Sequence, residues 1–172
     1  ATTVNLFEFI NITGLNIPFA FQVDQLSVLF LLIITGVGFL IHVYSTSYMH
    51  EEEPPHFARY FAYLNLFVFS MLLLVLGANY LIMFIGWEGV GLCSYLLIGY
   101  WFKNTEYGNA ARKAFVMNRI GDLGFLFGLF FIIQQFGSLT YAEVFPQAQG
   151  AGVGILTVIT LLLFVGATGK SA

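Results

Sequence analysis

Long apolar runs separated by short polar stretches make up the chain after residue 24. A helix needs about 20 residues to cross a bilayer, and several of these runs reach or approach that length. They predict helices at about residues 26–48, 60–76, 80–101, 110–133 and 152–172. The pattern therefore predicts an all-α polytopic membrane protein, with about five transmembrane helices forming a bundle in residues 25–172.

The first 24 residues are too polar to span a membrane. Apolar and other residues alternate from Ile17 to Asp24, which predicts a short strand. Residues 7–10 can pair with this strand across a turn at residues 11–14. We expect residues 1–24 to form a surface hairpin or loop, with Asp24 at the N-terminal end of the first helix.

Basic residues gather in or beside the two connections that the helix order places on one side of the membrane. They are Arg59, Lys103, Arg112 and Lys113, whereas the N-terminal segment and the other two connections have no Lys or Arg. Cytoplasmic loops carry an excess of Lys and Arg. We therefore expect loops 49–59 and 102–109 on the cytoplasmic or matrix side, and the hairpin on the periplasmic or intermembrane-space side.

The composition of the chain excludes several classes of protein and of cofactor site. Only 9% of the residues are charged, against about 25% in soluble domains. A net charge of −3 argues against a nucleic-acid partner. The single Cys93 excludes an internal disulfide and an all-cysteine iron–sulfur cluster. We expect no cofactor and no metal in this chain, and we expect it to be a fragment truncated at its C-terminal end, because the last apolar run has no closing loop.

Glu88 is the only charged residue between Arg59 and Lys103. An ionised acid at the bilayer centre costs roughly 2.5–3.5 kcal/mol on insertion scales. A purely structural role is the weaker interpretation, because its own helix offers no cation at i±3 or i±4. We interpret Glu88 as a proton-handling residue.

Two more charged residues are predicted at the depth of Glu88. With about 1.5 Å of rise per residue, Glu88 lies roughly 12 Å into its helix. Arg119 and Asp122 lie about 14 and 18 Å into the next one, which enters from the opposite side. They either form a self-neutralising pair that fixes packing or one step of a polar path across the membrane. On the helix of Glu88, a separate stripe of Gly86, Gly89 and Cys93 is expected to let a neighbouring helix pack closely.

The remaining ionisable residues each admit two interpretations. Counted along a straight helix, Lys170 lies about 27 Å from residue 152, as a snorkelling lysine would. The nearby glycines instead suggest an interrupted helix with an ion site near the midplane. His42 could relay protons or only hydrogen-bond a neighbour. The loop residues His50, Glu51–Glu53 and His56 could bind a metal, although a solvated loop is the more ordinary interpretation.

Four stretches of the sequence resemble stretches of a known protein family. They are Phe61–Met71, Gly86–Gly99, Asn118–Leu123 and Gly169–Ser171. Together they closely resemble the chain L family of respiratory complex I, known in mitochondria as subunit 5 of NADH dehydrogenase. The run Trp87–Tyr95 favours chain L over its sister antiporter-like subunits. The resemblance covers essentially the whole chain, although family members are several times longer.

The resemblance implies a fold of inverted five-helix repeats, similar to cation/proton antiporters. It implies that Glu88 is the family's buried glutamate and that Lys170 is its lysine at a helix break near the midplane. Arg119 and Asp122 match its charged residues on the intervening helix. The expected partners are the lipid bilayer and other membrane-arm subunits of complex I. NADH, flavin, iron–sulfur clusters and quinone are expected in partner subunits and not in this chain. The expected location is the bacterial or mitochondrial inner membrane.

These implications suggest a mechanism for proton translocation. Lys170 would carry a proton reversibly, Glu88 would be the carboxylate that switches its affinity, and Asp122 and Arg119 would offer alternative partners. The redox chemistry of NADH:quinone oxidoreductase would take place in other subunits. The alternatives are the large subunit of a multisubunit sodium/proton antiporter, a related hydrogenase subunit and a non-transporting scaffold.

Overall fold

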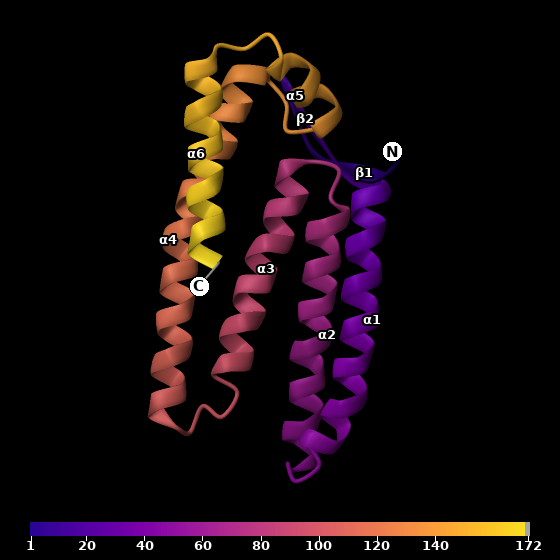
Figure 1. Cartoon of the computed structure of the whole chain (residues 1–172), viewed down its shortest axis with the longest axis vertical. Coiled ribbons are helices and arrows are strands. Elements are labelled where there is room, and N and C mark those ends of the chain that lie inside the picture. Colours follow the sequence, from indigo (N-terminus) through magenta and orange to yellow (C-terminus); the bar gives the residue numbers. More distant parts are fainter. Residues whose placement is uncertain (171–172) are drawn as a thin grey trace.

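A computed structural model describes residues 1–170 as an N-terminal hairpin followed by a helical bundle (Figure 1). The elements are β1 (Thr2–Ile12), β2 (Leu15–Val23), α1 (Gln25–Tyr48), α2 (Pro54–Leu76), α3 (Tyr80–Ile98), α4 (Thr105–Phe136), α5 (Tyr141–Ala148) and α6 (Val153–Lys170). All of the helices except α5 are long and apolar enough to cross a membrane. The predicted membrane fold class and the hairpin are confirmed. Residues 171–172 of the last predicted helix lie outside the described residues.

The hairpin is longer than the alternation pattern predicts. β1 pairs antiparallel with β2 from Thr2 opposite Val23 to Ile12 opposite Leu15. The turn lies at Thr13–Gly14, and Gly14 has a φ of 89°, which glycine adopts without steric cost. Residues 11 and 12, expected in the turn, are therefore paired. Phe7 stacks on Phe19 with ring centroids 5.0 Å apart, a cross-strand contact that adds to the pairing.

Several helix ends differ from the hydropathy pattern. α2 begins at Pro54 instead of residue 60, because proline suits the first turn, where the backbone N–H groups have no helical partner. α4 begins at Thr105 instead of 110, because the Asn104 side chain caps it by accepting from the Glu106 N–H. It ends at Phe136 instead of residue 133, and the following Gly137 has a φ of 67°. Hydropathy marks the apolar middle of a helix, whereas polar caps and prolines set its ends.

Two further boundaries are corrected. α3 ends at Ile98 instead of residue 101, and the Gly99 N–H closes it on the Tyr95 carbonyl. The region 134–150 lies between two of the predicted spanning helices, and its sequence predicts a polar loop with a short amphipathic turn at residues 141–145. It contains the eight-residue helix α5, whose short length hides it from a search for spanning helices.

Asp24 caps α1 as expected. Its carboxylate accepts from the Ser27 backbone N–H at 2.8 Å, and the Ser27 hydroxyl accepts from the Asp24 N–H at 2.8 Å. This reciprocal capping box satisfies two backbone donors that the helix leaves open. The hydrogen bond from the Ser27 N–H holds the pKa of Asp24 below its usual value.

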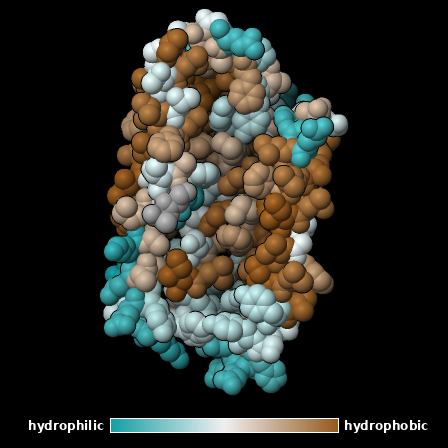
Figure 2. Space-filling model, viewed as in Figure 1, coloured by the Kyte–Doolittle hydropathy of each residue, from teal (hydrophilic) through white to brown (hydrophobic). Residues whose placement is uncertain are grey.

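The helices pack in a row: α1 on α2, α2 on α3, α3 on α4, and α4 on α6 (Figure 1). The hairpin and α5 lie at one end, and the α1–α2 and α3–α4 connections lie at the other. Apolar residues cover much of the middle of the visible face, and polar residues gather toward the ends (Figure 2). This distribution suits a helical bundle in a bilayer.

A buried apolar cluster joins β2, α4, α5 and α6 at the hairpin end. Its fully buried members are Ile17, Phe125, Leu129, Ile132, Leu139, Val144 and Ile159. Asn79, which is 0% exposed, accepts from the Ile82 N–H and donates to the Pro18 carbonyl. It thereby caps α3 and ties it to β2. These contacts anchor the helices that carry the candidate site.

Candidate functional site

The α2–α3 contact sets which way Glu88 points. A Cβ added at Gly86 would lie 2.7 Å from the Ser70 carbonyl oxygen, and one at Gly89 would lie 2.5 Å from the Ser70 hydroxyl oxygen. The small residues of α3 therefore lie against α2, as predicted. Glu88 is two residues from Gly86, about 200° around the helix, and so it points away from α2.

Glycines also bring α4 and α6 together. A Cβ added at Gly121 would lie 2.7 Å from the Gly169 Cα, and one at Gly166 would lie 2.7 Å from the Phe125 Cβ. At the first contact the two helix backbones can approach this closely because neither Gly121 nor Gly169 carries a side chain, and at the second the bare Gly166 makes room for the Phe125 side chain. Lys170 directly follows Gly169, so this contact places the lysine against α4.

Four charged residues on α3, α4 and α6 form two ion pairs, and we call them the four-charge cluster. The Arg119 guanidinium contacts the Glu88 carboxylate. The Lys170 Nζ lies 4.0 Å from the Asp122 Oδ1. The two pairs cancel in charge, as ionisable groups inside a membrane require.

The two pairs differ in burial. The Asp122 side chain is 5% exposed and that of Lys170 is 15% exposed, whereas Arg119 remains 49% exposed. The Arg119 guanidinium also lies over the Phe115 ring, 4.9 Å from its centroid. The Lys170–Asp122 pair is therefore the buried one, and the Glu88–Arg119 pair lies toward the surface of the described chain.

This pairing bears on two of the interpretations made from the sequence. The self-neutralising Arg119–Asp122 pair, one of the two alternatives for these residues, is absent within residues 1–170, because Arg119 pairs with Glu88 across the α3–α4 contact. The carboxylate paired with Lys170 is Asp122 and not Glu88. Sequence spacing fixes depth along each helix, but the rotation of the helices decides which charges meet.

The depth that the straight-helix count gave for Lys170 is also corrected, in the direction that the resemblance implied. α6 reaches Lys170 as one helix from Val153, so no break precedes the lysine. The hairpin-side end of α6 lies beyond that of α3, and its other end stops about midway along α4 (Figure 1). The straight-helix count gave the right distance from the start of α6 to Lys170, but it assumed that α6 begins at the same membrane depth as the other helices. Lys170 therefore lies beside the middle of α3.

A cavity of about 610 Å³ lies beside Lys170. Side chains of α2, α3, α4 and α6 line it, among them Phe67, Trp87, Ser94, Asn118 and Lys170. Among residues 1–170, the buried Lys170 Nζ has no hydrogen-bond partner. A space of this size with polar groups in its wall can hold water.

The structure does not bring His42 into the four-charge cluster. His42 lies on α1, which packs on α2, and its Nδ1 lies 2.7 Å from the Gly38 carbonyl oxygen. Its buried Nε2 has no hydrogen-bond partner in the described chain. A relay role for His42 stays a prediction.

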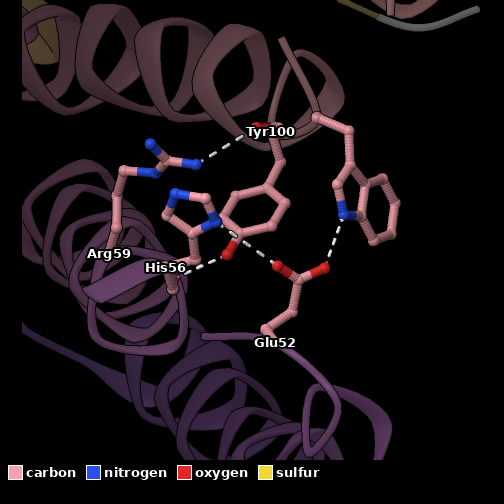
Figure 3. Close-up of polar contacts among 5 residues, drawn as sticks. Glu52, His56, Arg59 and Tyr100 are labelled. Atoms are coloured by element: carbon pink, nitrogen blue, oxygen red, sulfur yellow. Dashed lines mark hydrogen bonds and ion pairs between the residues drawn. The ribbon is translucent and has the colours of Figure 1, made fainter. Parts of the chain in front are cut away.

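Two of the residues weighed as metal ligands, Glu52 and His56, belong instead to a polar network that joins the α1–α2 connection and the start of α2 to the α3–α4 connection (Figure 3). The Glu52 carboxylate lies 3.6 Å from the His56 Nδ1 and accepts from the Trp101 Nε1 at 2.7 Å. The Tyr100 hydroxyl donates to the His56 carbonyl at 2.6 Å, and burial raises the pKa of Tyr100. No group of three or more His, Cys, Asp or Glu side chains suited to a metal occurs in residues 1–170.

Two residues at the cluster were missed from the sequence. The Trp87 Nε1 donates to the Asp122 Oδ1 at 2.7 Å. A Cβ added at Gly91 would lie 2.7 Å from the Lys170 Nζ, so its bare backbone makes room for the ammonium. Trp87 and Gly91 are four residues apart on the face beside Glu88, which is the signal that could have identified them.

Comparison with known proteins agrees with this architecture. Residues 9–61 match the family described as NADH-ubiquinone oxidoreductase (complex I), chain 5 N-terminus. Residues 77–172 match the family described as NADH:quinone oxidoreductase/Mrp antiporter, TM. The chain is also similar to a solved structure of the Mrp complex from Dietzia sp. DQ12-45-1b, with a TM-score of 0.88, 25% identity, and coverage of 99% of this chain and 18% of that one.

Two relatives are more similar in sequence. NADH-quinone oxidoreductase subunit L of Mycobacterium tuberculosis is 52% identical over 97% of this chain. NADH-ubiquinone oxidoreductase chain 5 of Rhizopus stolonifer is 48% identical over 99% of it. The chain spans 26% of the length of each relative. It therefore belongs to the family of antiporter-like membrane subunits shared by NADH:quinone oxidoreductase and Mrp antiporters, as its resemblance to chain L predicted.

Proposed function

We propose that this chain is part of the proton-translocating membrane-arm subunit of NADH:quinone oxidoreductase, with Glu88, Lys170, Asp122 and Arg119 on the proton route. The observation that carries the proposal is that two ion pairs join three helices, α3, α4 and α6, each long and apolar enough to span a membrane. Ionisable groups at such a depth mark ion pathways in membrane proteins. The similarity to complex I subunits supports the redox-driven version of this function.

Lys170 carries the proton in this proposal. It lies 4.0 Å from Asp122, beyond the length of a hydrogen bond. It also borders a cavity that can hold water. A lysine held this loosely can take a proton from water on one side and release it to water on the other.

The Glu88–Arg119 pair supplies the switch. While Arg119 contacts Glu88, it neutralises the charge that Glu88 would exert on Lys170. When Arg119 moves away, the free carboxylate favours the protonated form of Lys170. Arg119 is half exposed, so it can move with little repacking. Glu88 thus acts on Lys170 through its change of partner and not through a direct ion pair.

The energy source and the partners lie outside this chain. Other subunits would hold NADH, flavin, iron–sulfur clusters and quinone, and further membrane-arm subunits would pack against it in the bilayer. Loops 49–59 and 102–109 would face the cytoplasm or matrix, by their basic residues. The membrane would be the bacterial or mitochondrial inner membrane.

A second candidate is the large subunit of a multisubunit sodium/proton antiporter. The similarity to the Mrp complex structure favours it. The lower identity to that structure, 25% against 52% for the subunit L relative, makes it the weaker candidate.

The test uses Glu88→Gln in the full-length subunit, with the complex purified and reconstituted in vesicles. We expect an assembled complex that still oxidises NADH but translocates fewer than half as many protons per electron. Glu106→Gln, an exposed change at the start of α4, is the control. Equal loss of assembly and pumping would leave only a scaffold role. Sodium-driven proton exchange without NADH oxidation in the wild type would identify the antiporter.

A further inference from the structure

Trp87 contacts both members of the buried ion pair from a third helix. Its Nε1 donates to the Asp122 Oδ1 at 2.7 Å. Its ring centroid lies 5.4 Å from the Lys170 Nζ. The same Oδ1 atom faces Lys170 at 4.0 Å. One indole from α3 therefore contacts the acid of α4 and the base of α6.

Both contacts favour the charged states of the pair. An indole N–H can only donate, and its hydrogen bond to a carboxylate is stronger than one to a neutral acceptor. The face of an indole attracts a cation within about 6 Å but has no such attraction for a neutral amine. Trp87 therefore stabilises ionised Asp122 together with protonated Lys170.

The indole is held in position by its own packing. The Trp87 ring lies 5.3 Å from the Phe125 ring, which stacks on Phe84 at 5.4 Å. Phe125 is 3% exposed and belongs to the buried apolar cluster. The ring is thus fixed before Lys170 gains or loses its proton.

We propose that Trp87 is a positioning residue that keeps Asp122 directed at Lys170, and that it thereby sets the pH range over which the lysine site exchanges its proton. The proposal rests on the proposed function of the four-charge cluster. The other charged groups near Lys170 are Glu88 from α3 and Arg119 from α4, and α6 has no other charged residue among those described.

The test is Trp87→Phe in the full-length subunit, within the complete complex in vesicles. Phenylalanine keeps an aromatic face against Phe125 but has no N–H for Asp122. Without that donor, Asp122 is free to rotate and the protonated lysine loses its nearest anion. We expect the alkaline limb of the pH profile of protons per electron to move to lower pH by about one unit.

Trp101→Phe is the matched control, because it also removes a hydrogen bond that an indole N–H donates over 2.7 Å, in this case to Glu52 in the loop network. It should leave the pH profile unchanged. The second comparison is Trp87→Phe in an Asp122→Asn background. The shift should disappear there, because Asp122 no longer has a charge to hold.

An unchanged pH profile in Trp87→Phe would overturn the proposal. A pH shift of equal size in the Asp122→Asn background would also overturn it, because that result would mean that Trp87 acts through packing alone. If Trp87→Phe does not assemble, benzothienylalanine at position 87 replaces only the N–H by sulfur and should give the same shift. Normal pumping by Lys170→Met would refute the proposed function itself. A defective Lys170→Met beside a normal Trp87→Phe would refute only the role of Trp87.

Discussion

At the scale of single residues, the lysine site depends on the absence of a side chain at Gly91. A Cβ at this position would lie 2.7 Å from the Lys170 Nζ and 3.7 Å from the Asn118 Nδ2. Both of these neighbours are ends of side chains, and the nearer one is the flexible end of Lys170. An added methyl group would therefore move the ammonium without separating the helices.

Gly91→Ala is expected to lower proton pumping while the complex still assembles. The displaced ammonium would leave its position near Asp122 and the Trp87 ring. Gly36→Ala is the control, because a Cβ there meets no atom of residues 1–170 within 4 Å. Protons per electron, measured at equal NADH turnover, distinguish the two variants. Equal pumping by both would show that the position of the ammonium is not critical.

The depth of a charged residue was predictable from the sequence where it depends only on distance along one helix. The fixed rise per residue brought Glu88, Arg119 and Asp122 to one level, and the structure pairs Glu88 with Arg119 across helices. The choice of partners was not predictable, because it depends on helix rotation. The straight-helix count misplaced Lys170 for a related reason, because the starting level of α6 relative to α3 is a tertiary feature, and only the resemblance implied a position near the midplane.

At the scale of elements, the α4–α6 contact determines where Lys170 lies. Gly121 and Gly169 face each other so closely that a Cβ on Gly121 would lie 2.7 Å from the Gly169 Cα. Backbone atoms cannot rotate aside as a side chain can. Any side chain at Gly121 must push the two helices apart.

Gly121→Ala is therefore expected to destabilise the α4–α6 pair by about 1–3 kcal/mol, the usual cost of overpacking. It should also carry Lys170 away from Asp122. Thermal unfolding of the purified complex and its assembled fraction measure the first effect. Gly108→Ala, also on α4, should behave as wild type, because a Cβ added there lies within 4 Å of no atom in the described part of the chain. A stable Gly121→Ala complex would contradict the close backbone contact.

Elements were predictable where hydropathy alone identifies them. The five spanning helices follow from apolar runs of bilayer length. Their ends were missed at Pro54 and Thr105, where polar residues and prolines extend a helix past its apolar part. α5 was missed as a helix because eight residues are too few to carry a spanning signal.

At the scale of the whole molecule, the two ends of the bundle are chemically different. One end has the hairpin and α5, and the other has the network of Glu52, His56 and Trp101 joining two loops (Figures 1 and 3). The basic residues flank the loops of the second end. Positive charge near the ends of transmembrane helices sets orientation, so the loop end should face the cytoplasm or matrix.

Cysteine labelling tests this orientation. In a full-length subunit otherwise free of cysteine, Glu106→Cys should react with an impermeant maleimide only from the cytoplasmic or matrix side. Asn16→Cys in the hairpin should react only from the opposite side. Both positions are exposed. The reverse labelling pattern would contradict the assigned orientation, and labelling of both from one side would contradict the separation of the two ends.

The most direct measurement is protons translocated per electron in Lys170→Met, with Lys103→Met as the control. Both variants remove one lysine charge, but Lys103 is exposed in a loop and Lys170 lies against Asp122. If the four-charge cluster is a proton route, the Lys170→Met complex should assemble and oxidise NADH but translocate fewer protons per electron. The Lys103→Met complex should translocate the normal number. A normal proton ratio in assembled Lys170→Met would contradict the account.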